Sequence, residues 1–476
     1  MNDCILLRYG EIGLKSKRTR PYFEKLFLEG VKSSLKRIGI EELKIECFGG
    51  RFVVYCKNID EVCRVLSRVA GIQSLSPAKK ITFSSKKDLT EKIKKITKNL
   101  VCKKTFAVRV RRIGKHQFSS TDIAKTVGSS LIRKSKGVDL TKPEISIHLE
   151  IRDFDCFVYI EKISGVGGLP IGTSGEVLCL FSGGIDSPVA AYEMMKRGCK
   201  VDFLFLNIIG EKLMFDVSKV YNFLIARYTF TYTPKMFIID GKEIIESIKN
   251  EVPDNLRQIA YKIVLYKISE LIAQKNNYLA LVSGESIAQK SSQTLKSLLF
   301  IEKQISITML RPLLSFDKIE ITDKARQIGT FSSSEKIKEY CDLSEGPVTT
   351  APHELDMKKI PSFKKEIDKG VKNVLIKKGV LMIKDTKQIN IPFNSKIVSI
   401  DIRPSTKQKN NPIKTDKQMS YSKALKNLDF FQKEKIYLIV CEFGVLSENL
   451  SFEIKKRGVK AIGLSVNAFK NYSKKN

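Results

Sequence analysis

The stretch from Val177 to Ser187, Val-Leu-Cys-Leu-Phe-Ser-Gly-Gly-Ile-Asp-Ser, decides the fold of the middle of the chain. Its first five residues are apolar and predict a buried strand, and the residues from 187 to 196 predict a helix. A second apolar run at 201–207 predicts the next strand. Strand, helix and strand in this order form a βαβ unit, and the alternation continues to about residue 311. We therefore predict a central α/β domain with a parallel sheet.

The turn between the first strand and the helix reads Ser182-Gly183-Gly184-Ile185-Asp186-Ser187. Glycines let the backbone approach a ligand closely, and a helix N-terminus presents free N–H groups and the positive end of its dipole. The spacing of the Walker motif is absent. A glycine-serine turn is a common structural feature by itself, but a strand before it and a helix after it favour a pyrophosphate cradle.

The flanking segments predict further domains, as expected for 476 residues. Strands at 3–9 and 51–57 flank a helix at about 22–37, which indicates a small α+β unit. Strands at 105–111, 144–152 and 156–160, with a helix at 120–134, indicate a second one. Residues 352–390 are rich in lysine and favour a linker with some helix, and strands at 396–401 and 436–440 indicate a last α/β unit.

The charge balance favours a polyanionic partner. The chain has 84 lysine and arginine residues against 51 aspartate and glutamate residues, a formal charge of +33. Such a charge attracts nucleic acid in a salt-dependent way, although a generally lysine-rich surface is the alternative. We expect no membrane partner and a cytoplasmic location, because no apolar segment approaches the ~20 residues of a membrane span and the N-terminus has no signal-peptide pattern.

The cysteines are scattered. There are ten, without a C-x-x-C pair, and only three histidines. This argues against a zinc site, a disulfide framework or another metal centre held by the protein. Most of the thiols should be small core residues, but in a reducing compartment one or two can do chemistry.

Several motifs after the glycine turn carry a family resemblance. They are Ser283–Thr294 (SGESIAQKSSQT), Leu310–Leu313 (LRPL), Asp317-Lys318 and Ile328-Gly329-Thr330. Together with SGGIDS they resemble the PP-loop domain of the tRNA 4-thiouridine synthetase family, whose pattern has a glycine where this chain has Ala288. PP-loop enzymes cleave ATP between the α- and β-phosphates and adenylate a substrate oxygen.

The resemblance implies a set of nucleotide contacts, with ATP and Mg²⁺ as cofactors. Asp186 would support magnesium or substrate activation, and Lys318 would stabilise charge on the phosphates. Without the motifs around them, Lys262 and Lys318 would be taken as solvated lysines. The implied ATP contacts are Leu180, Phe181, Ser182, Gly183, Gly184, Ser187, Lys262, Gly284 and Gln293.

Two N-terminal stretches resemble the same family. Residues 7–15 (LRYGEIGLK) match its N-terminal unit, and the run from Phe106 (FAVRVRRIGKHQFSS) resembles a THUMP domain, which grips tRNA near its acceptor end. A basic strand can contact phosphates without reading bases. Our candidate tRNA contacts are Arg109, Arg111, Arg112 and Lys115, and a basic edge that merely prevents aggregation is the alternative.

The C-terminal unit contains a cysteine between an apolar strand and a helix. Cys441 begins the run CEFGVLS, which resembles the active loop of a rhodanese domain, and Asp401-Ile402-Arg403 matches that domain's early strand end. Helix N–H groups at this place would lower the pKa of a thiol and hold a persulfide, whereas Glu442 would oppose the thiolate. A buried core thiol is the alternative.

A second thiol has a counterpart in the family. Cys341, in Glu339-Tyr340-Cys341, matches the position of the family's second functional cysteine. The resemblance implies that a cysteine desulfurase loads Cys441 with sulfur and that Cys341 attacks the carrier sulfur. The outcome would be released sulfide or a Cys341–Cys441 disulfide that a reductant reopens.

The resemblance implies a multidomain α/β and α+β protein that uses ATP and persulfide sulfur to convert a tRNA uridine (position 8) into 4-thiouridine. A sulfur-carrier protein for thiamine synthesis is a further possible partner. The alternatives are a non-enzymatic RNA-binding protein and a PP-loop enzyme that makes another thionucleoside. The expected divisions are a ferredoxin-like domain at 1–60, a THUMP domain at 61–165, a PP-loop domain at 166–351, a linker at 352–390 and a rhodanese-like domain at 391–476.

Overall fold

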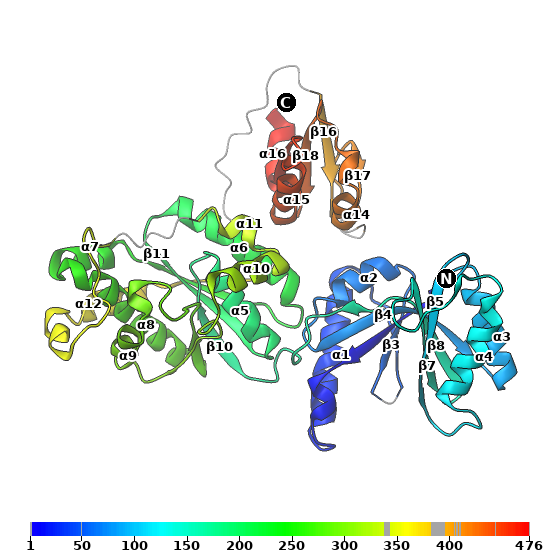
Figure 1. The fold of residues 1–476 in the computed structure, drawn as a ribbon. Coiled ribbons are helices and arrows are strands. Elements are labelled where there is room, and N and C mark those ends of the chain that lie inside the picture. Colours follow the sequence, from blue (N-terminus) through cyan, green and yellow to red (C-terminus); the bar gives the residue numbers. More distant parts are fainter. Residues whose placement is uncertain are drawn as a thin grey trace. The chain divides into compact units, whose positions relative to one another are not determined.

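The computed structural model describes residues 2–48, 50–337, 343–381, 396–403, 405, 408, 411–442 and 444–475. The chain divides into two compact units, Met1–Pro170 and Ile171–Asn476. Both units combine sheets with helices (Figure 1).

The first unit is built on one nine-stranded sheet, with the strand order β2-β3-β1-β4-β8-β7-β5-β6 and β9 paired to β4. Its strands are β1 (Cys4–Tyr9), β2 (Lys44–Cys47), β3 (Phe52–Tyr55), β4 (Ile72–Thr82), β5 (Thr105–Ile113), β6 (Gly137–Val138), β7 (Ile145–Arg152), β8 (Asp155–Tyr159) and β9 (Ile163–Ser164). The long strand β4 pairs with β1 along its first part and with β8 along its last four residues. This strand therefore joins the two predicted α+β units into one sheet.

Each half of this sheet has its own helices. They are α1 (Arg20–Arg37), α2 (Ile59–Leu66), α3 (Lys86–Thr97) and α4 (Ser120–Ile132). Phe27 of α1 stacks on Phe52 of β3 with the ring centroids 5.2 Å apart. Helices α3 and α4 bury their apolar side chains against alternate residues of β5, β7 and β8. The intervening residues of β5, which include Arg109 and Arg111, therefore lie on the face of the sheet opposite to these helices.

A buried ionic cluster connects the two halves of the first unit. Glu150 of β7 accepts hydrogen bonds from Arg152 (2.8 Å), Arg51 (2.9 Å) and Arg8 (3.5 Å). Burial opposes ionisation of Glu150, but the hydrogen bond from Arg152 and the charges of Arg51 and Arg8 outweigh it and hold its pKa below the ordinary value. Arg8 also lies 4.7 Å from the centre of the Tyr159 ring. The cluster depends on this one carboxylate, because three guanidinium groups surround it.

Glu150→Gln is expected to destabilise the first unit by about 3 kcal/mol, because it leaves buried arginines without their counter-charge. The pKa of Glu150 is lower in the folded than in the unfolded chain, so the stabilisation is present above a pH of about 4.3 and is lost as the pH falls. Hydrogen exchange of the β4 and β7 amides in the variant measures the loss. Glu91→Gln is the matched control, since Glu91 is exposed and lies 3.9 Å from Lys94. Equal protection in the two variants would contradict the role of the cluster.

The second unit begins with the predicted α/β domain, a six-stranded sheet of order β14-β13-β10-β11-β12-β15. The strands are β10 (Glu176–Leu180), β11 (Lys200–Asn207), β12 (Lys235–Asp240), β13 (Ala280–Val282), β14 (Thr308–Leu310) and β15 (Leu375–Lys378). All pair in parallel except β15, which runs antiparallel to β12. The expectation of a parallel sheet through about residue 311 is confirmed.

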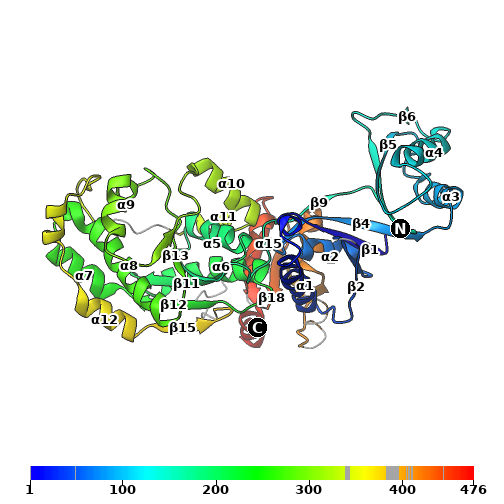
Figure 2. The ribbon, with the colours of Figure 1, turned by 90° about the horizontal axis from the view of Figure 1, so that it is seen from below.

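Helices cover both faces of this sheet (Figure 2). The helices are α5 (Asp186–Lys196), α6 (Glu211–Tyr228), α7 (Lys242–Glu251), α8 (Arg257–Lys275), α9 (Leu295–Glu302), α10 (Lys318–Ile328), α11 (Phe331–Ser334) and α12 (Lys364–Lys372). Helices α7, α8 and α12 share one apolar core with alternate strand residues such as Phe237. On the other face, Tyr221 of α6 packs edge-on against Phe203 of β11. The loop after β10 thus starts from a strand buried between two helix layers.

The segment 352–390, predicted to be a linker with some helix, does contain a helix, but its described part is packed on the central domain. Its described part forms α12, which joins the core of the central domain, and β15, which adds an edge strand to that domain's sheet. All four β15 side chains are exposed. The backbone pairing, rather than an apolar face, therefore holds this strand in place.

The C-terminal part of the second unit has four parallel strands in the order β17-β16-β18-β19. Its elements are β16 (Ile397–Asp401), β17 (Lys417–Gln418), α14 (Tyr421–Lys426), β18 (Ile436–Cys441), α15 (Val445–Lys455), β19 (Lys460–Ser465) and α16 (Val466–Lys475). Across the described residues, no helix combines the length and apolarity required to span a membrane.

Candidate active site

The glycine turn lies between β10 and α5, at the carboxyl end of the sheet, where α/β proteins commonly bind ligands. The backbone N–H groups of Ser182 and Gly183 each donate to the Ser187 hydroxyl at 3.2 Å. The N–H of Gly184 donates to the Ser182 hydroxyl at 3.3 Å. These bonds fix the turn and its two hydroxyl groups at the start of a helix, and a helix N-terminus is a place that suits phosphate oxygens.

Two glycines are required by the close packing of this turn. Gly183 has a φ of +77°, and a Cβ added there would come within 3.0 Å of Val217. Gly284 follows β13, and a Cβ on it would lie 2.9 Å from the carbonyl carbon of Asp186 and 3.0 Å from the nitrogen of Ser187. A larger residue at 284 would therefore push the first turn of α5 away from β13.

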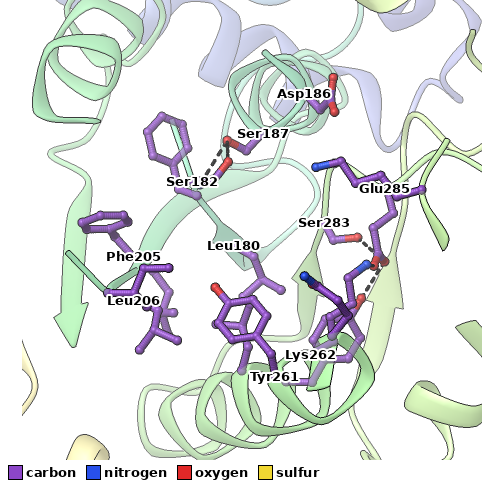
Figure 3. Close-up of a pocket in the computed structure, with 18 of the residues that line it drawn as sticks. Leu180, Ser182, Asp186, Ser187, Phe205, Leu206, Tyr261, Lys262, Ser283 and Glu285 are labelled. Carbon is purple, nitrogen blue, oxygen red and sulfur yellow. Dashed lines mark hydrogen bonds and ion pairs between the residues drawn. The ribbon is translucent and has the colours of Figure 1, made fainter. Parts of the chain in front are cut away.

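A cavity opens beside the turn and has an apolar and a polar side (Figure 3). Tyr261, Leu180 and Leu206 lie together on the apolar side, and Ser182 and Ser187 lie on the other. Such a cavity suits a ligand with a flat apolar ring and an anionic tail. Of the predicted site residues, those that line it are Leu180, Phe181, Ser182, Asp186, Ser187, Lys262, Gly284 and Gln293, and Gly183 and Gly184 belong to the adjoining turn.

Asp186 and Lys318 lie together, although they are far apart in the sequence. Asp186 is the first residue of α5, and its carboxylate accepts a hydrogen bond from the ammonium group of Lys318, the first residue of α10, at 2.7 Å. The side-chain amide of Gln289 donates to the other carboxylate oxygen at 3.0 Å. The sequence motif SGESIAQ contains Gln289 but does not by itself reveal this contact.

Glu285 lines the cavity and is the centre of a group of hydrogen-bonded side chains. This buried carboxylate is paired with Lys262 and accepts hydrogen bonds from Tyr266 (2.5 Å), Ser283 (2.8 Å) and Arg311 (2.9 Å). Burial opposes its ionisation, but the charges of Lys262 and Arg311 outweigh this and lower its pKa to about 2. Glu285 therefore stays ionised and fixes the position of the Lys262 ammonium group. Glu285 and Arg311 lie within quoted motifs, but only the fold shows that they meet.

Ala288 adopts the conformation that explains the glycine of the family pattern. Its φ is +60°, in the left-handed region, and its N–H donates to the carbonyl of Gln293 at 3.0 Å. A residue with a Cβ pays roughly 1–2 kcal/mol in this region. The loop thus keeps the required geometry with alanine, at a small cost in stability.

Cys441 is the last residue of β18, and its side chain is only 4% exposed. The N–H of Ser447, in the first turn of α15, donates to its sulfur at 3.3 Å, and the thiol donates to the Ser447 hydroxyl at 3.4 Å. Cys441 also belongs to an apolar core cluster. This position is therefore compatible with both interpretations of Cys441, a thiol that contacts the start of a helix and a thiol buried in the core.

The acidic neighbour of Cys441 has a counter-charge. Glu442 lies 3.5 Å from a guanidinium nitrogen of Arg403, whose other nitrogens bind Asp401 at 2.8–3.2 Å. Arg403 thereby reduces the repulsion that Glu442 would exert on a thiolate. The predicted second thiol, Cys341, lies outside the described residues.

The four basic candidates lie along β5 and the turn after it. Arg109, Arg111 and Lys115 are exposed, and Arg109 donates to the carbonyl of Leu140 at 2.9 Å. Arg112 is partly buried and donates to Gly114 and to His116. Among the described residues, no group of three or more His, Cys, Asp or Glu side chains is arranged to hold a metal ion.

Comparisons with known proteins agree with this architecture. Residues 172–365 match the family described as thiamine biosynthesis protein (ThiI), residues 83–161 match the THUMP domain, and residues 4–76 match the ThiI ferredoxin-like domain. A solved 4-thiouridine synthetase in complex with RNA and ATP superposes with a TM-score of 0.67 at 25% identity, over 79% of this chain and all of that one.

Two curated relatives extend the similarity over nearly the whole chain. The tRNA sulfurtransferase of Thermoplasma volcanium is 35% identical over 96% of this chain and 94% of its own length. That of Pyrobaculum aerophilum is 33% identical over 97% and 96%. The site geometry, the order of the domains and this coverage lead to one conclusion: the chain belongs to the tRNA sulfurtransferase family.

Proposed function

We propose that this protein uses ATP to adenylate a tRNA uridine and replaces the activated oxygen with persulfide sulfur, giving 4-thiouridine at position 8. The observation that carries the proposal is the internally hydrogen-bonded turn Ser182–Ser187 at the start of α5, beside the Asp186–Lys318 pair. This arrangement lies in a chain of the tRNA sulfurtransferase family. The solved relative with RNA and ATP supports both ligands.

In the first half-reaction, the adenine ring would lie against Tyr261, Leu180 and Leu206, and the phosphates would meet the glycine turn. The uridine O4 attacks the α-phosphorus, a new O–P bond forms, and pyrophosphate leaves with the electron pair of the broken P–O bond. The helix N-terminus and Lys318 stabilise the charge that develops on the phosphates. Gln289 and Lys318 hold the Asp186 carboxylate in a fixed orientation.

Mg²⁺ fits this site as a companion of ATP. Magnesium is commonly held by one or two carboxylates together with substrate phosphates, and Asp186 supplies a carboxylate at the polar side of the cavity. The ion would offset phosphate charge, and Asp186 would position it. Glu285 is less suitable, because it is buried and four side chains share its two oxygens, whereas each oxygen of Asp186 has one side-chain partner.

In the second half-reaction, we assign Cys441 as the sulfur carrier in a rhodanese-like domain and a cysteine desulfurase as its donor. The terminal persulfide sulfur attacks C4 of the adenylated uridine, and AMP leaves. Cys341 then attacks the Cys441 sulfur, which forms a Cys341–Cys441 disulfide and leaves the transferred sulfur on the uridine. If Cys341 attacks the persulfide first, sulfide is released and adds to C4 instead. The support for this assignment is the Ser447 N–H at the Cys441 sulfur.

The proposed domains keep the divisions 1–60, 61–165, 166–351 and 391–476, and the described part of 352–390 is packed on the central domain. We place the protein in the cytoplasm, where tRNA and reductant are present. The match to a thiamine biosynthesis family supports a second role in sulfur supply to a carrier protein for thiamine.

Exchange of labelled pyrophosphate into ATP tests the first half-reaction. With tRNA present and no sulfur donor, exchange should be rapid, because the adenylated tRNA can only return to ATP. Without tRNA it should fall to background. A protein that only binds RNA would give no exchange in either case, and this result would overturn the proposal.

Charge reversal of Arg109 and Arg111 together is expected to weaken tRNA binding and to lower the slope of log affinity against log salt by about 2, one for each lost phosphate contact. Both side chains lie on the face of the sheet away from α3 and α4. Titration of tRNA at several salt concentrations measures the change. The matched control reverses Lys95 and Lys98, two exposed lysines of the α3 region. Equal effects in both variants would mean that net charge, and not this face, determines binding.

A further inference from the structure

Glu442 is an acidic residue placed directly after the proposed sulfur carrier. Cys441 is the last residue of β18, and the neighbouring strand β16 ends at Asp401. The parallel register pairs Asp401 with Val440. Two residues further along each chain, Arg403 and Glu442 lie 3.5 Å apart. The carboxyl ends of the two strands thus bring one cation and two carboxylates to the edge of the sheet where the thiol lies.

The positive charge of Arg403 is already matched by Asp401. The Asp401 carboxylate accepts from Nε and Nη2 of Arg403 at 2.8–3.2 Å, and both side chains are 0% exposed. The remaining nitrogen, Nη1, lies 3.5 Å from Oε2 of Glu442, and neither atom has a hydrogen-bond partner among the residues that the structure describes. One guanidinium group therefore faces two carboxylates, and one negative charge is left over.

The left-over charge of Glu442 acts on the space around the thiol. Its side chain is 31% exposed, so water screens it incompletely. The Cα atoms of consecutive residues are about 3.8 Å apart, well within the ~8–10 Å over which a charge acts in physiological salt. A carboxylate oxygen that is buried without a hydrogen bond destabilises the fold, and such an exception calls for an explanation.

The chemistry of sulfur loading gives this charge a role. The Cys441 thiolate attacks the outer sulfur of a donor, the S–S bond of the donor breaks, and the leaving group departs with the electron pair. With thiosulfate the leaving group is sulfite, and the donor arrives with two negative charges. With a protein persulfide the leaving group is a cysteine thiolate, and the outer sulfur carries at most one charge. A fixed carboxylate repels the first donor more strongly than the second.

We propose that Glu442 is a specificity-determining residue of the sulfur carrier, whose negative charge excludes small anionic sulfur donors such as thiosulfate and reserves Cys441 for a protein-bound persulfide. The proposal rests on the proposed function, because it needs Cys441 to be the carrier. It adds selection of the donor by charge to the hydrogen bond by which Ser447 holds the sulfur.

Two alkylating reagents of nearly equal size test the selection, since iodoacetamide is neutral and iodoacetate carries one negative charge. Peptide mass spectrometry gives the rate at which each reagent modifies Cys441. The ratio of the two rates is the measured quantity, because a change in the thiolate fraction affects both reagents equally. The ratio of iodoacetate to iodoacetamide should rise about tenfold in Glu442→Gln, which removes one partly screened charge, and further in Glu442→Lys.

Glu434→Gln is the matched control, because Glu434 is an exposed glutamate just before β18, and its ratio should equal that of the wild type. High salt should reduce the difference between wild type and Glu442→Gln. Persulfide formation from thiosulfate, relative to that from the cysteine desulfurase, should follow the same order of variants. Thermal melting of each variant shows whether the fold is kept.

An unchanged ratio in both Glu442 variants would overturn the selection. A Cys441 that neither reagent modifies in any variant would also overturn it, because a thiol that no small molecule reaches has no small donor to exclude. If the desulfurase instead placed its sulfur on another cysteine, the proposed function of Cys441 would fail whatever the alkylation ratio, so the two failures are distinguishable.

Discussion

Asp186→Ala is expected to lower tRNA-dependent pyrophosphate exchange by about 100-fold or more, because the variant loses the carboxylate that binds Lys318 and Gln289 beside the proposed phosphate site. Removing the carboxylate leaves the Lys318 ammonium group without this partner and removes the proposed support for Mg²⁺. Affinity for tRNA should stay within about twofold of the wild type, since the proposed tRNA contacts lie in the first unit.

Asp186→Asn separates the charge from the hydrogen bonds. The amide oxygen can still accept from Lys318 or Gln289, so this variant should fold normally and still lose most of its activity. Asp323→Ala is the control, because Asp323 is an exposed carboxylate of α10 that is paired with Arg326. If both Asp186 variants exchanged pyrophosphate at the wild-type rate, the role assigned to this carboxylate would be wrong.

Cys441→Ser is expected to abolish thiolation driven by the cysteine desulfurase while leaving pyrophosphate exchange intact. The variant retains the hydrogen bond from the Ser447 N–H to the side chain at 441 but cannot carry a persulfide. Peptide mass spectrometry after incubation with the desulfurase should find the extra sulfur on Cys441 in the wild type and none at this position in the variant. Cys102→Ser is the control, because Cys102 is an exposed thiol of the first unit.

The partner thiol should behave differently. Cys341→Ser should still accept sulfur on Cys441 and stall at transfer or resolution. A single turnover of wild type without reductant should leave a Cys341–Cys441 cross-linked peptide that dithiothreitol removes. Persulfide on another cysteine, or full activity of Cys441→Ser with the desulfurase, would show that Cys441 is the core thiol that its burial also allows.

The elements of the central domain could be predicted because their signals are local. The apolar run at 177–181 and the glycine turn after it correspond to β10 and the loop before α5, within one or two residues. Strand β15 was not predicted from the sequence, and the reason is physical. Its side chains are all exposed, so it has no apolar face, and its lysines resemble those of a solvated linker.

The polar framework of the site could not be read from the sequence. Gln289 and Asp186 are 103 positions apart, and Lys262 and Glu285 are 23 apart. The periodic pattern of apolar residues in the sequence does not indicate such contacts, because each contact depends on how the strands and helices pack. The motif residues were therefore predictable as a set, while the pairing of Lys318 with Asp186 and of Arg403 with Glu442 required the fold.

Mass spectrometry of nucleosides from tRNA incubated with the protein, ATP, Mg²⁺, a cysteine desulfurase and cysteine tests the central claim most directly. We predict 4-thiouridine at position 8, formed only when ATP is present and absent when Asp186→Ala replaces the wild type. A different thionucleoside, such as 2-thiouridine or 2-thiocytidine, or unmodified tRNA despite tRNA-dependent pyrophosphate exchange, would contradict it.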